Sequence, residues 1–169
     1  LVTTYTPPVG LAYVAGALRE AQFELCFIDG LGESLDTRHD WVKDCYICGL
    51  TLEQIVERIP DDVEMIGVHA GFSFDWPMCK VLIKLIRERF PNIVLIGGGE
   101  HVSAVPEASL VESALDIIVC GEGEETAVQI ARSVENGITN FESIDGIAFH
   151  SKNGEFIKTE SRARLKDVD

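Results

Sequence analysis

The stretch Asn92-Ile-Val-Leu-Ile-Gly-Gly-Gly-Glu-His-Val-Ser-Ala-Val-Pro-Glu107 decides the fold class of this chain. Residues 93–96 are consecutive apolar residues, a run typical of a parallel strand that is buried on both faces. Gly97, Gly98 and Gly99 follow at once, although each glycine costs roughly 1 kcal/mol of backbone entropy relative to alanine. Pro106 suits the first turn of a following helix. The glycines are therefore expected at the carboxyl end of a parallel strand, where open α/β sheets bind ligands.

Strand and helix patterns alternate on both sides of this stretch. Besides 93–96, the apolar runs predict strands at 1–4, 23–28, 64–70 and 116–120. Helical spacing and capping residues predict helices at 9–22, 51–59 (capped by Thr51), 75–90 (capped by Asp75, with Trp76 and Pro77 in its first turn), 106–113 and 124–136 (stopped by Asn136-Gly137). Residues 33–49 are expected to be irregular, and Asn153-Gly154 predicts a hairpin between 144–150 and 155–159.

This alternation predicts an α/β fold, a Rossmann/flavodoxin-like three-layer sandwich whose five-stranded sheet is mostly parallel and is followed by a C-terminal β-hairpin. In a flavodoxin-like strand order, the strands ending at Thr6, Ala70 and Gly97 would be neighbours. Residues 1–143 are expected to form the domain, and residues 144–169 the hairpin and the start of a linker. Because the chain begins at Leu1 and ends in a charged segment, we expect it to be a piece of a longer protein.

Composition narrows the classes of partner. The formal charge of −14 argues against electrostatic binding to nucleic acid. A hydrophobic content of 46% argues for a packed domain. No apolar run is long enough to span a bilayer and no leader is recognisable, so no membrane partner is expected. The five scattered cysteines predict a reducing, cytoplasmic location.

The loops after the strands supply the candidate binding residues. They are Thr6 and Pro8 after the first strand, Ala70, Gly71, Phe72 and Ser73 after the third, Gly97, Gly98, Gly99, His101 and Ser103 after the fourth, and Gly121, Glu122 and Gly123 after the fifth. Small residues at the third and fourth strand ends would leave a slot for a flat aromatic group, with two serine hydroxyls at its mouth. The alternative is that the glycines only make tight turns. For His101, binding and bracing of the loop both remain open.

Other chemistries find less support. The turn from Gly121 to Thr126 carries three carboxylates where a dinucleotide phosphate would sit, and Glu124 and Glu125 are better explained as partners of the helix dipole. The pair Cys45-x-x-Cys48 with His39 lacks a fourth zinc ligand and is interpreted as ordinary thiols, so no metal site is predicted. His69 is expected to be a buried core histidine, and Asp29 to hydrogen-bond local backbone. No catalytic triad is recognisable.

Several segments, taken in order, resemble one family. They are Pro7-Pro8-Val9-Gly10-Leu11 with Tyr13-Val14-Ala15, Phe27-Ile28-Asp29, Gly98-Gly99-Glu100-His101 with Pro106-Glu107, Asp116-Ile117-Ile118-Val119 with Gly121-Glu122-Gly123-Glu124-Glu125-Thr126, and Asp145-Gly146-Ile147-Ala148. Their order and spacing resemble the B12-binding domains at the N-terminus of cobalamin-dependent radical SAM enzymes. Glu100 stands where that family has a proline.

The resemblance implies that cobalamin lies across the strand ends, with its dimethylbenzimidazole tail in the slot beside Ala70, Gly71 and the glycines from Gly97. Leu31 stands where better-known cobalamin domains carry the histidine that ligates cobalt, so the corrinoid is expected to bind base-off without it. The Cys-x-x-x-Cys-x-x-Cys motif is absent, so the 4Fe–4S cluster and S-adenosylmethionine are expected only in a radical SAM barrel elsewhere in the parent chain. The fragment alone is not expected to be catalytic.

The parent enzyme is then expected to be a methyltransferase or an anaerobic oxidative cyclase. An alternative is a cobalamin-free docking or substrate-binding domain of such a protein. A free-standing FMN domain ranks last, because the loops lack a Ser/Thr-rich phosphate cradle.

Overall fold

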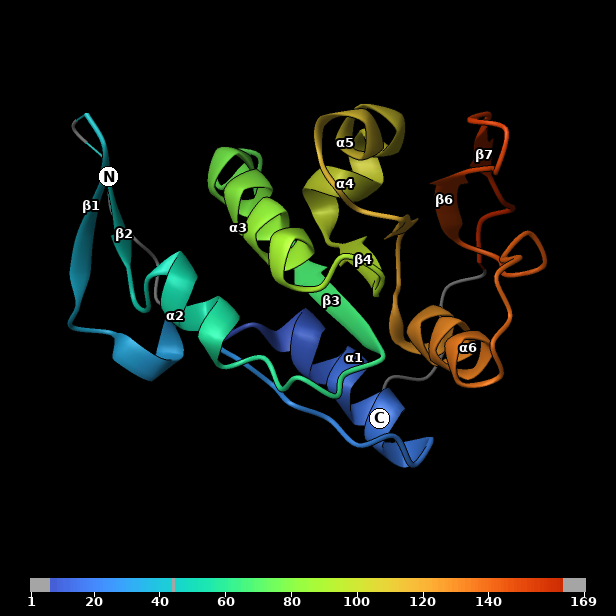
Figure 1. Ribbon diagram of the computed structural model, residues 1–169, viewed down its shortest axis with the longest axis horizontal. Helices are drawn as coiled ribbons and strands as arrows, with labels where there is room; N and C mark the ends of the chain where they lie inside the picture. The colour runs from blue at the N-terminus through green and yellow to red at the C-terminus, as the bar shows by residue number, and fades with distance from the viewer. Residues whose placement is uncertain (1–6, 44, 163–169) are drawn as a thin grey trace.

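A five-stranded sheet forms the centre of the computed structural model, which describes residues 7–43 and 45–162 (Figure 1). Its strands follow chain order: β3 (Met65–His69), β4 (Val94–Gly98), β5 (Ile117–Val119), β6 (Ile147–His150) and β7 (Phe156–Lys158). The first three are parallel, and β6 and β7 are antiparallel additions at one edge. The C-terminal hairpin predicted around Asn153-Gly154 is confirmed, and Gly154 has φ of +81° in its loop.

Helices cover both faces of this sheet, so the predicted three-layer α/β fold is confirmed. On one face lie α3 (Trp76–Arg89), α4 (Glu100–Ala104) and α5 (Pro106–Glu112), and on the other lie α1 (Val9–Glu20) and α6 (Glu124–Glu135) (Figure 1). The short helix α2 (Leu52–Glu57) packs beside α3. Strand β4 has fully buried Leu95 on the α3 face and buried Ile96 on the α6 face, as its continuous apolar run predicts.

Local signals account for most helix ends. Thr51 accepts a hydrogen bond from the N–H of Gln54, whose side chain accepts one from Thr51 N–H, so the predicted cap is confirmed as a capping box. Helix α3 begins one residue after Asp75, as predicted, but the Asp75 side chain makes no capping bond. Burial raises the pKa of this carboxyl. Gly137, with φ of +67°, follows the end of α6. The helix α4, which begins directly after Gly99, was not predicted.

The strand predicted at residues 23–28 is wrong. This segment has no regular secondary structure and pairs with no strand in the described part of the chain, and the outer edge of β3 has no described partner either. Phe23, the first residue of the segment, contacts helices α1 and α6 instead. Its N–H donates to Leu18 O at 3.1 Å, and the Arg132 guanidinium lies 4.4 Å from the centre of its ring. The strand predicted at 1–4, and with it the neighbour expected at Thr6, lies outside the described residues. Strands β3 and β4 are neighbours, as the flavodoxin-like order requires.

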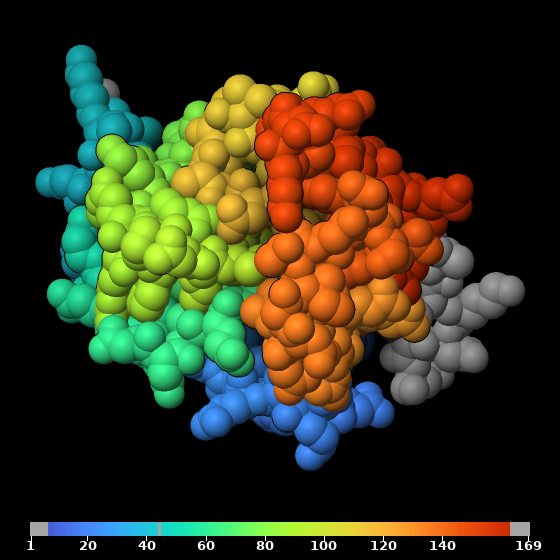
Figure 2. Space-filling model, turned by 45° about the vertical axis from the view of Figure 1, so that its right-hand side comes forward, coloured from blue at the N-terminus to red at the C-terminus, as the bar shows by residue number. Residues whose placement is uncertain are grey.

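The irregular segment predicted at 33–49 contains a hairpin instead. A short 3-10 helix, η1 (Gly32–Ser34), leads into β1 (Arg38–Val42) and the antiparallel β2 (Cys45–Cys48). Half-buried and exposed residues alternate along β1, the pattern of a strand, although its polar residues disguise it in the sequence. The ribbon projects from the body of the molecule (Figures 1 and 2). Its base is fixed because Leu50 N–H donates to Gly30 O at 2.7 Å.

Candidate functional site

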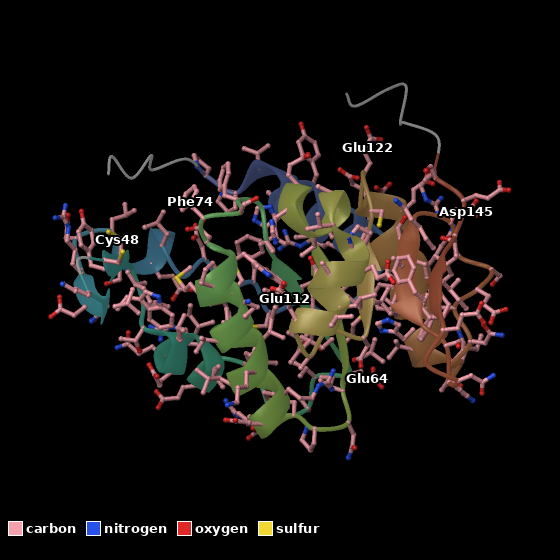
Figure 3. All side chains as sticks on the ribbon, turned by 90° about the horizontal axis from the view of Figure 1, so that it is seen from above. Cys48, Glu64, Phe74, Glu112, Glu122 and Asp145 are labelled. Carbon is pink, nitrogen blue, oxygen red and sulfur yellow. The ribbon has the colours of Figure 1, made fainter. Side chains whose placement is uncertain are left out.

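The carboxyl ends of the parallel strands bring most of the predicted binding residues to one edge of the sheet. Figure 3 shows Phe74 and Glu122, from the loops after β3 and β5, on this edge, whereas Glu64, before β3, lies on the opposite one. The loop after β4 joins them through α4. Thr6 lies outside the described residues. The edge predicted to bind a ligand is therefore formed by three neighbouring loops.

The three consecutive glycines have three different environments. A Cβ at Gly97 would lie 2.5 Å from Leu115 Cδ1, so this glycine is required by core packing. Gly99 has φ of +114°, and a Cβ there would lie 2.7 Å from Ala70 O. Ala70 is buried and its N–H donates to Gly98 O at 2.7 Å, so the ends of β3 and β4 close against each other at this point. Only Gly98 of the three opens onto free space, with nothing within 4 Å of the position of a Cβ.

His101 connects the loops after β3 and β4. Its Nδ1 and Ser73 Oγ share a hydrogen bond at 2.9 Å, and its ring lies 4.9 Å from the Trp76 ring. This contact provides the bracing role considered from the sequence. The other ring nitrogen, Nε2, is buried and has no hydrogen-bond partner among the described residues. His101 therefore also keeps one polar atom for a group that the described chain does not supply.

The partners of Trp76 form a charged anchor beside this contact. Glu112 on α5 accepts hydrogen bonds from Trp76 Nε1 at 3.1 Å and from Lys80 Nζ at 2.9 Å. The bond from Lys80, followed by that from Trp76, lowers the pKa of the Glu112 carboxyl. This anchor ties α3 to α5.

Ser103 braces the loop after β5. Its hydroxyl donates to Val119 O at 3.3 Å and accepts from Gly121 N–H at 3.3 Å. Gly121 has φ of +84° and leaves open space, whereas a Cβ at Gly123 would lie 3.3 Å from Val14 of α1. A Cβ at Gly71 would lie 2.8 Å from Cε1 of the His69 ring. Phe72 is exposed and its ring stacks on that of Phe74, with centroids 5.5 Å apart.

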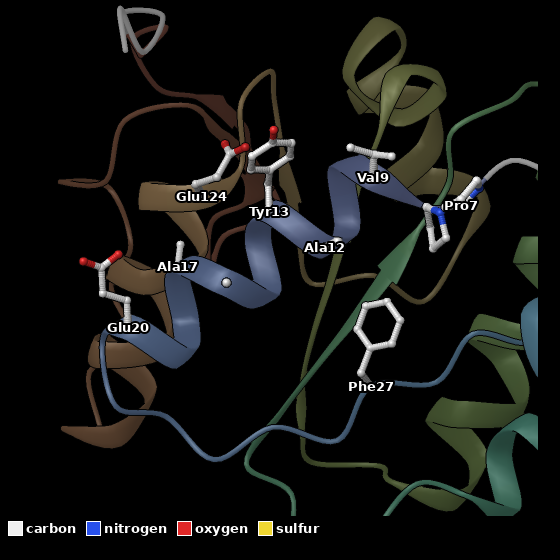
Figure 4. A pocket seen from close by; sticks show the side chains of 10 residues that line it. Pro7, Val9, Ala12, Tyr13, Ala17, Glu20, Phe27 and Glu124 are labelled. Carbon is white, nitrogen blue, oxygen red and sulfur yellow. The ribbon is translucent and has the colours of Figure 1, made fainter. Parts of the chain in front are cut away.

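An open cavity of about 640 Å³ lies beside α1 (Figure 4). It is lined by Pro7, Pro8, Val9, Ala12, Tyr13, Gly16, Ala17, Glu20, Phe27 and Glu124. Of the residues predicted from the sequence, only Pro8 is among them. The signal that could have indicated the cavity is the run of small residues along one side of α1, which leaves room where larger side chains would fill it.

Two further predictions about single residues have opposite outcomes. Asp29 Oδ1 accepts a hydrogen bond from Gly32 N–H at 2.9 Å, so the local backbone contact is confirmed. His69 is exposed at the end of β3, so its prediction as a buried core histidine is wrong. It pairs in register with Gly98 and lies on the same sheet face as Gly67. Both residues are exposed, so α6 does not cover this part of the face on which it packs.

The described side chains include no group of three or more His, Cys, Asp or Glu residues arranged to hold a metal ion. Cys45 and Cys48 lie three residues apart on β2 and so point to opposite faces of the ribbon. No helix in the described part of the chain is both long enough and apolar enough to cross a membrane.

Comparison with known proteins connects this chain to a family. An uncharacterized methyltransferase of Pyrococcus horikoshii is 29% identical over 170 residues, which cover all of this chain and 33% of the relative. An anaerobic magnesium-protoporphyrin IX monomethyl ester cyclase of Synechocystis is 30% identical over 168 residues, covering 96% of this chain and 30% of the relative. The chain thus spans about a third of the length of these relatives.

The fold has counterparts among solved structures. The radical S-adenosylmethionine methyltransferase TsrM from Kitasatospora setae, solved with cobalamin and a 4Fe–4S cluster bound, superposes with a TM-score of 0.70 at 20% identity. The alignment covers 99% of this chain and 29% of TsrM. The sequence model of the B12 binding domain matches residues 2–131, more than half of the chain. The chain therefore belongs to the family of B12-binding domains.

Proposed function

We propose that this chain binds a corrinoid cofactor across the carboxyl edge of its sheet, as one module of a longer radical SAM enzyme. The observation that carries the proposal is the family match together with free space and unpartnered polar atoms at that same edge. Gly98 and Gly121 leave open space there. His101 Nε2 and Glu124 Oε2 are buried without a hydrogen-bond partner among the described residues.

The cavity beside α1 offers room for part of such a ligand, and the rest would lie across the open strand ends. The cavity along α1 has about 640 Å³, and small-molecule sites commonly have ~300–1,000 Å³ and mostly apolar walls. In this proposal Gly98 and Gly121 allow close approach of the cofactor, and His101 and Glu124 offer it hydrogen bonds. Ser103 and Ser73 hold the loops in position through the bonds described above. A bound corrinoid would supply a cobalt centre able to carry a methyl group.

The cobalt is proposed to receive no histidine from the loop after residues 23–28. Leu31 occupies that loop, directly before η1, and a leucine side chain cannot ligate a metal. A base-off corrinoid without a histidine ligand is therefore the expected state. His69 is the exposed histidine nearest in register to Gly98, so a spectrum with a protein nitrogen ligand would implicate His69.

The reaction of the parent enzyme is proposed from its relatives. They are methyltransferases and anaerobic cyclases about three times as long as this chain. We propose that a radical SAM domain elsewhere in the parent holds the 4Fe–4S cluster and S-adenosylmethionine, and that this module presents the corrinoid to it. Methyl transfer or oxidative cyclisation would then take place between the two domains.

A second candidate is a docking or substrate-binding module without a corrinoid. It is favoured by the packing of Gly97 against Leu115 and of Gly99 against Ala70, which explains two of the three glycines without any ligand.

The test is a titration with hydroxocobalamin, followed by desalting and a visible spectrum. The wild-type chain is expected to retain pigment with a base-off spectrum. Gly98→Val should remove at least about 90% of the retained pigment and leave the melting temperature nearly unchanged, because its side chain would fill free space. The control Gly67→Val adds the same side chain to the same sheet face on the neighbouring strand, two residues before the strand end. Equal retention of pigment by a folded Gly98→Val variant would contradict the proposed position of the cofactor. Absence of pigment from both the wild-type chain and the full-length parent would favour the second candidate.

A further inference from the structure

Three segments that are distant in the sequence meet at Gly146, beside the loop after β5. Its N–H donates to Glu160 O at 2.7 Å, and its carbonyl accepts from Cys120 N–H at 2.7 Å. A Cβ at Gly146 would lie 3.4 Å from Cys120 O and from Thr126 Oγ1, and 3.5 Å from Arg162 Cβ. The segment after β7 is therefore in close contact with the end of β5 and the start of α6.

The Arg162 side chain joins this segment to α6. Its guanidinium donates to Glu125 Oε2 at 2.6 Å, to Gln129 Oε1 at 2.8 Å and to Thr126 Oγ1 at 2.9 Å. All three nitrogens of the guanidinium take part, and only 16% of the side chain is exposed. An arginine bound in this way is held in one orientation, which the single ammonium of a lysine does not reproduce.

Thr126 extends the contact to the turn before β6. It is fully buried, and its hydroxyl donates to Asp145 O at 3.3 Å while it accepts from Arg162. Together with the backbone bonds described above, these contacts form a closed circuit around the loop 121–123, because Cys120 precedes this loop and α6 follows it. The position of the loop is thus connected to the docking of the segment after β7.

Arg132 provides a comparison at the other end of α6. Its guanidinium pairs with Glu135 and donates to Ala21 O, so it also joins α6 to another segment. That contact lies in the last turns of the helix, far along it from the loop 121–123. The two arginines therefore separate the general stability of α6 from the order of the loop before it.

We propose that Arg162 is a positioning residue, which holds the loop 121–123 in its binding conformation while the segment after β7 is docked on α6. The role rests on the proposed function, in which the ligand of this loop is a corrinoid. Gly121 leaves open space at the binding edge, and its N–H is bonded to Ser103, so a shift of the loop would change the site. Because coupling between two events is reciprocal, corrinoid binding should also stabilise the docked segment.

The first arm of the test measures amide hydrogen exchange by NMR in the ligand-free protein. Arg162→Gln is expected to speed exchange of the Cys120, Gly121 and Gly146 amides about tenfold or more, the loss expected for hydrogen bonds to a charged group. The Ala70 amide, which donates to Gly98 O at the ends of β3 and β4, should be unchanged. The same acceleration at all four amides would indicate only a general loss of stability and would overturn the role of Arg162.

Two further variants control this arm. Arg162→Lys keeps the charge opposite Glu125 but cannot also reach Thr126 and Gln129, so it should restore only part of the protection. Arg132→Gln removes the arginine at the other end of α6 and should change exchange of these amides less than about twofold. Should Arg162→Gln fail to fold, Arg162→Lys takes its place.

The second arm measures the Kd of hydroxocobalamin by absorbance titration. Arg162→Gln is expected to raise the Kd about fivefold, the result if the loop keeps its binding conformation in about a fifth of the variant molecules. Arg132→Gln should change it less than about twofold. In the wild type, hydroxocobalamin should slow exchange of the Gly146 amide, whose partner is Glu160 O rather than the ligand.

The outcomes of the two arms are distinguishable. An unchanged Kd in Arg162→Gln, in a wild type that binds hydroxocobalamin, would overturn the positioning role and leave the proposed function intact. A wild type that binds no hydroxocobalamin, as this chain or as the full-length parent, contradicts the proposed function. The hold of Arg162 on the loop then depends on the first arm, and unchanged exchange of the Gly121 amide in Arg162→Gln overturns it.

Discussion

Helices α1 and α3 lie on opposite faces of the same sheet and have nearly the same length, 12 and 14 residues, but they pack in opposite ways. α3 buries Trp76, Cys79, Ile83 and Ile86 against the strands and α5. α1 buries no residue and borders the cavity of about 640 Å³. The comparison separates the face that holds most of the described core from a face on which the described residues leave open space.

The loops at the carboxyl edge belong to both faces. His101 and Ser103 tie α4 to the loops after β3 and β5, so the α3 side fixes the shape of the edge. Gly98 meets open space, and Glu124 lines the cavity beside α1. A rigid support of this kind is what a preorganised binding site requires.

The largest expected contrast is in stability. Ile83 of α3 is fully buried, so Ile83→Ala is expected to lower the free energy of unfolding by about 4 kcal/mol through lost burial and a new cavity. Leu18 of α1 is only partly buried, so Leu18→Ala should cost about 1 kcal/mol. Urea unfolding of both variants, with unchanged m-values, measures the difference. Equal losses would contradict the view that the α1 face contributes little to the core.

Much of the α3 side could be predicted from the sequence because its signals are local. The apolar run of β4, the capping residues of α2 and the proline at the start of α5 each determine structure within a few residues. The segment 23–28 has the composition of a strand, but a strand also needs a partner, and no local pattern shows whether one is present. The β1–β2 ribbon was missed for the complementary reason, because its polar residues resemble a loop until they pair.

The candidate site was predicted in position but not in detail. Gly97, Gly98 and Gly99 are identical in sequence, and their roles differ only through Leu115 and Ala70, which are distant along the chain. The interpretation of Glu124 as a partner of the helix dipole follows from its position, but its burial beside a cavity depends on where α1 lies. Whether the predicted residues bind a corrinoid stays a prediction, and the titration above tests it.

The loss of stability at alkaline pH should test how completely the α3 face is closed to water, because Cys79 is buried there. Desolvation by burial, with a smaller effect of the nearby Asp75 charge, raises the pKa of the Cys79 thiol from 9.0 to about 11. Below pH 9 both folded and unfolded chains keep the proton, and above it the unfolded chain ionises first. Folding should therefore lose about 2–3 kcal/mol between these two pKa values.

The measurement is the free energy of unfolding at pH 8 and at pH 11 in the wild type and in Cys79→Ala. Groups that titrate elsewhere in the chain are common to both proteins and cancel in the comparison. The alanine variant is expected to lose less stability over this interval. An identical pH dependence in both proteins would mean that water reaches the thiol and that the α3 face is less closed than the structure indicates.

The smallest expected effect concerns the charged anchor between α3 and α5. Hydrogen bonds from Lys80 and Trp76 lower the pKa of Glu112 below its ordinary 4.5, so the stability that this contact contributes is present above pH 4.5 and is lost as the pH falls through the lowered value. Because the Glu112 side chain is about half exposed, the effect on stability is small. The hydrogen bond from Trp76 Nε1 to Glu112 nevertheless allows the protonation of Glu112 to be followed by indole fluorescence. In a Trp41→Phe background, Trp76 fluorescence is expected to change as the pH falls below 4.5, because the lowered pKa of Glu112 places its protonation there. That change should vanish in Glu112→Gln and persist in Glu107→Gln, which alters a carboxylate in the first turn of the same helix. An unchanged transition in Glu112→Gln would show that α3 is held to α5 by apolar packing alone, and the contrast with α1 would then rest entirely on burial.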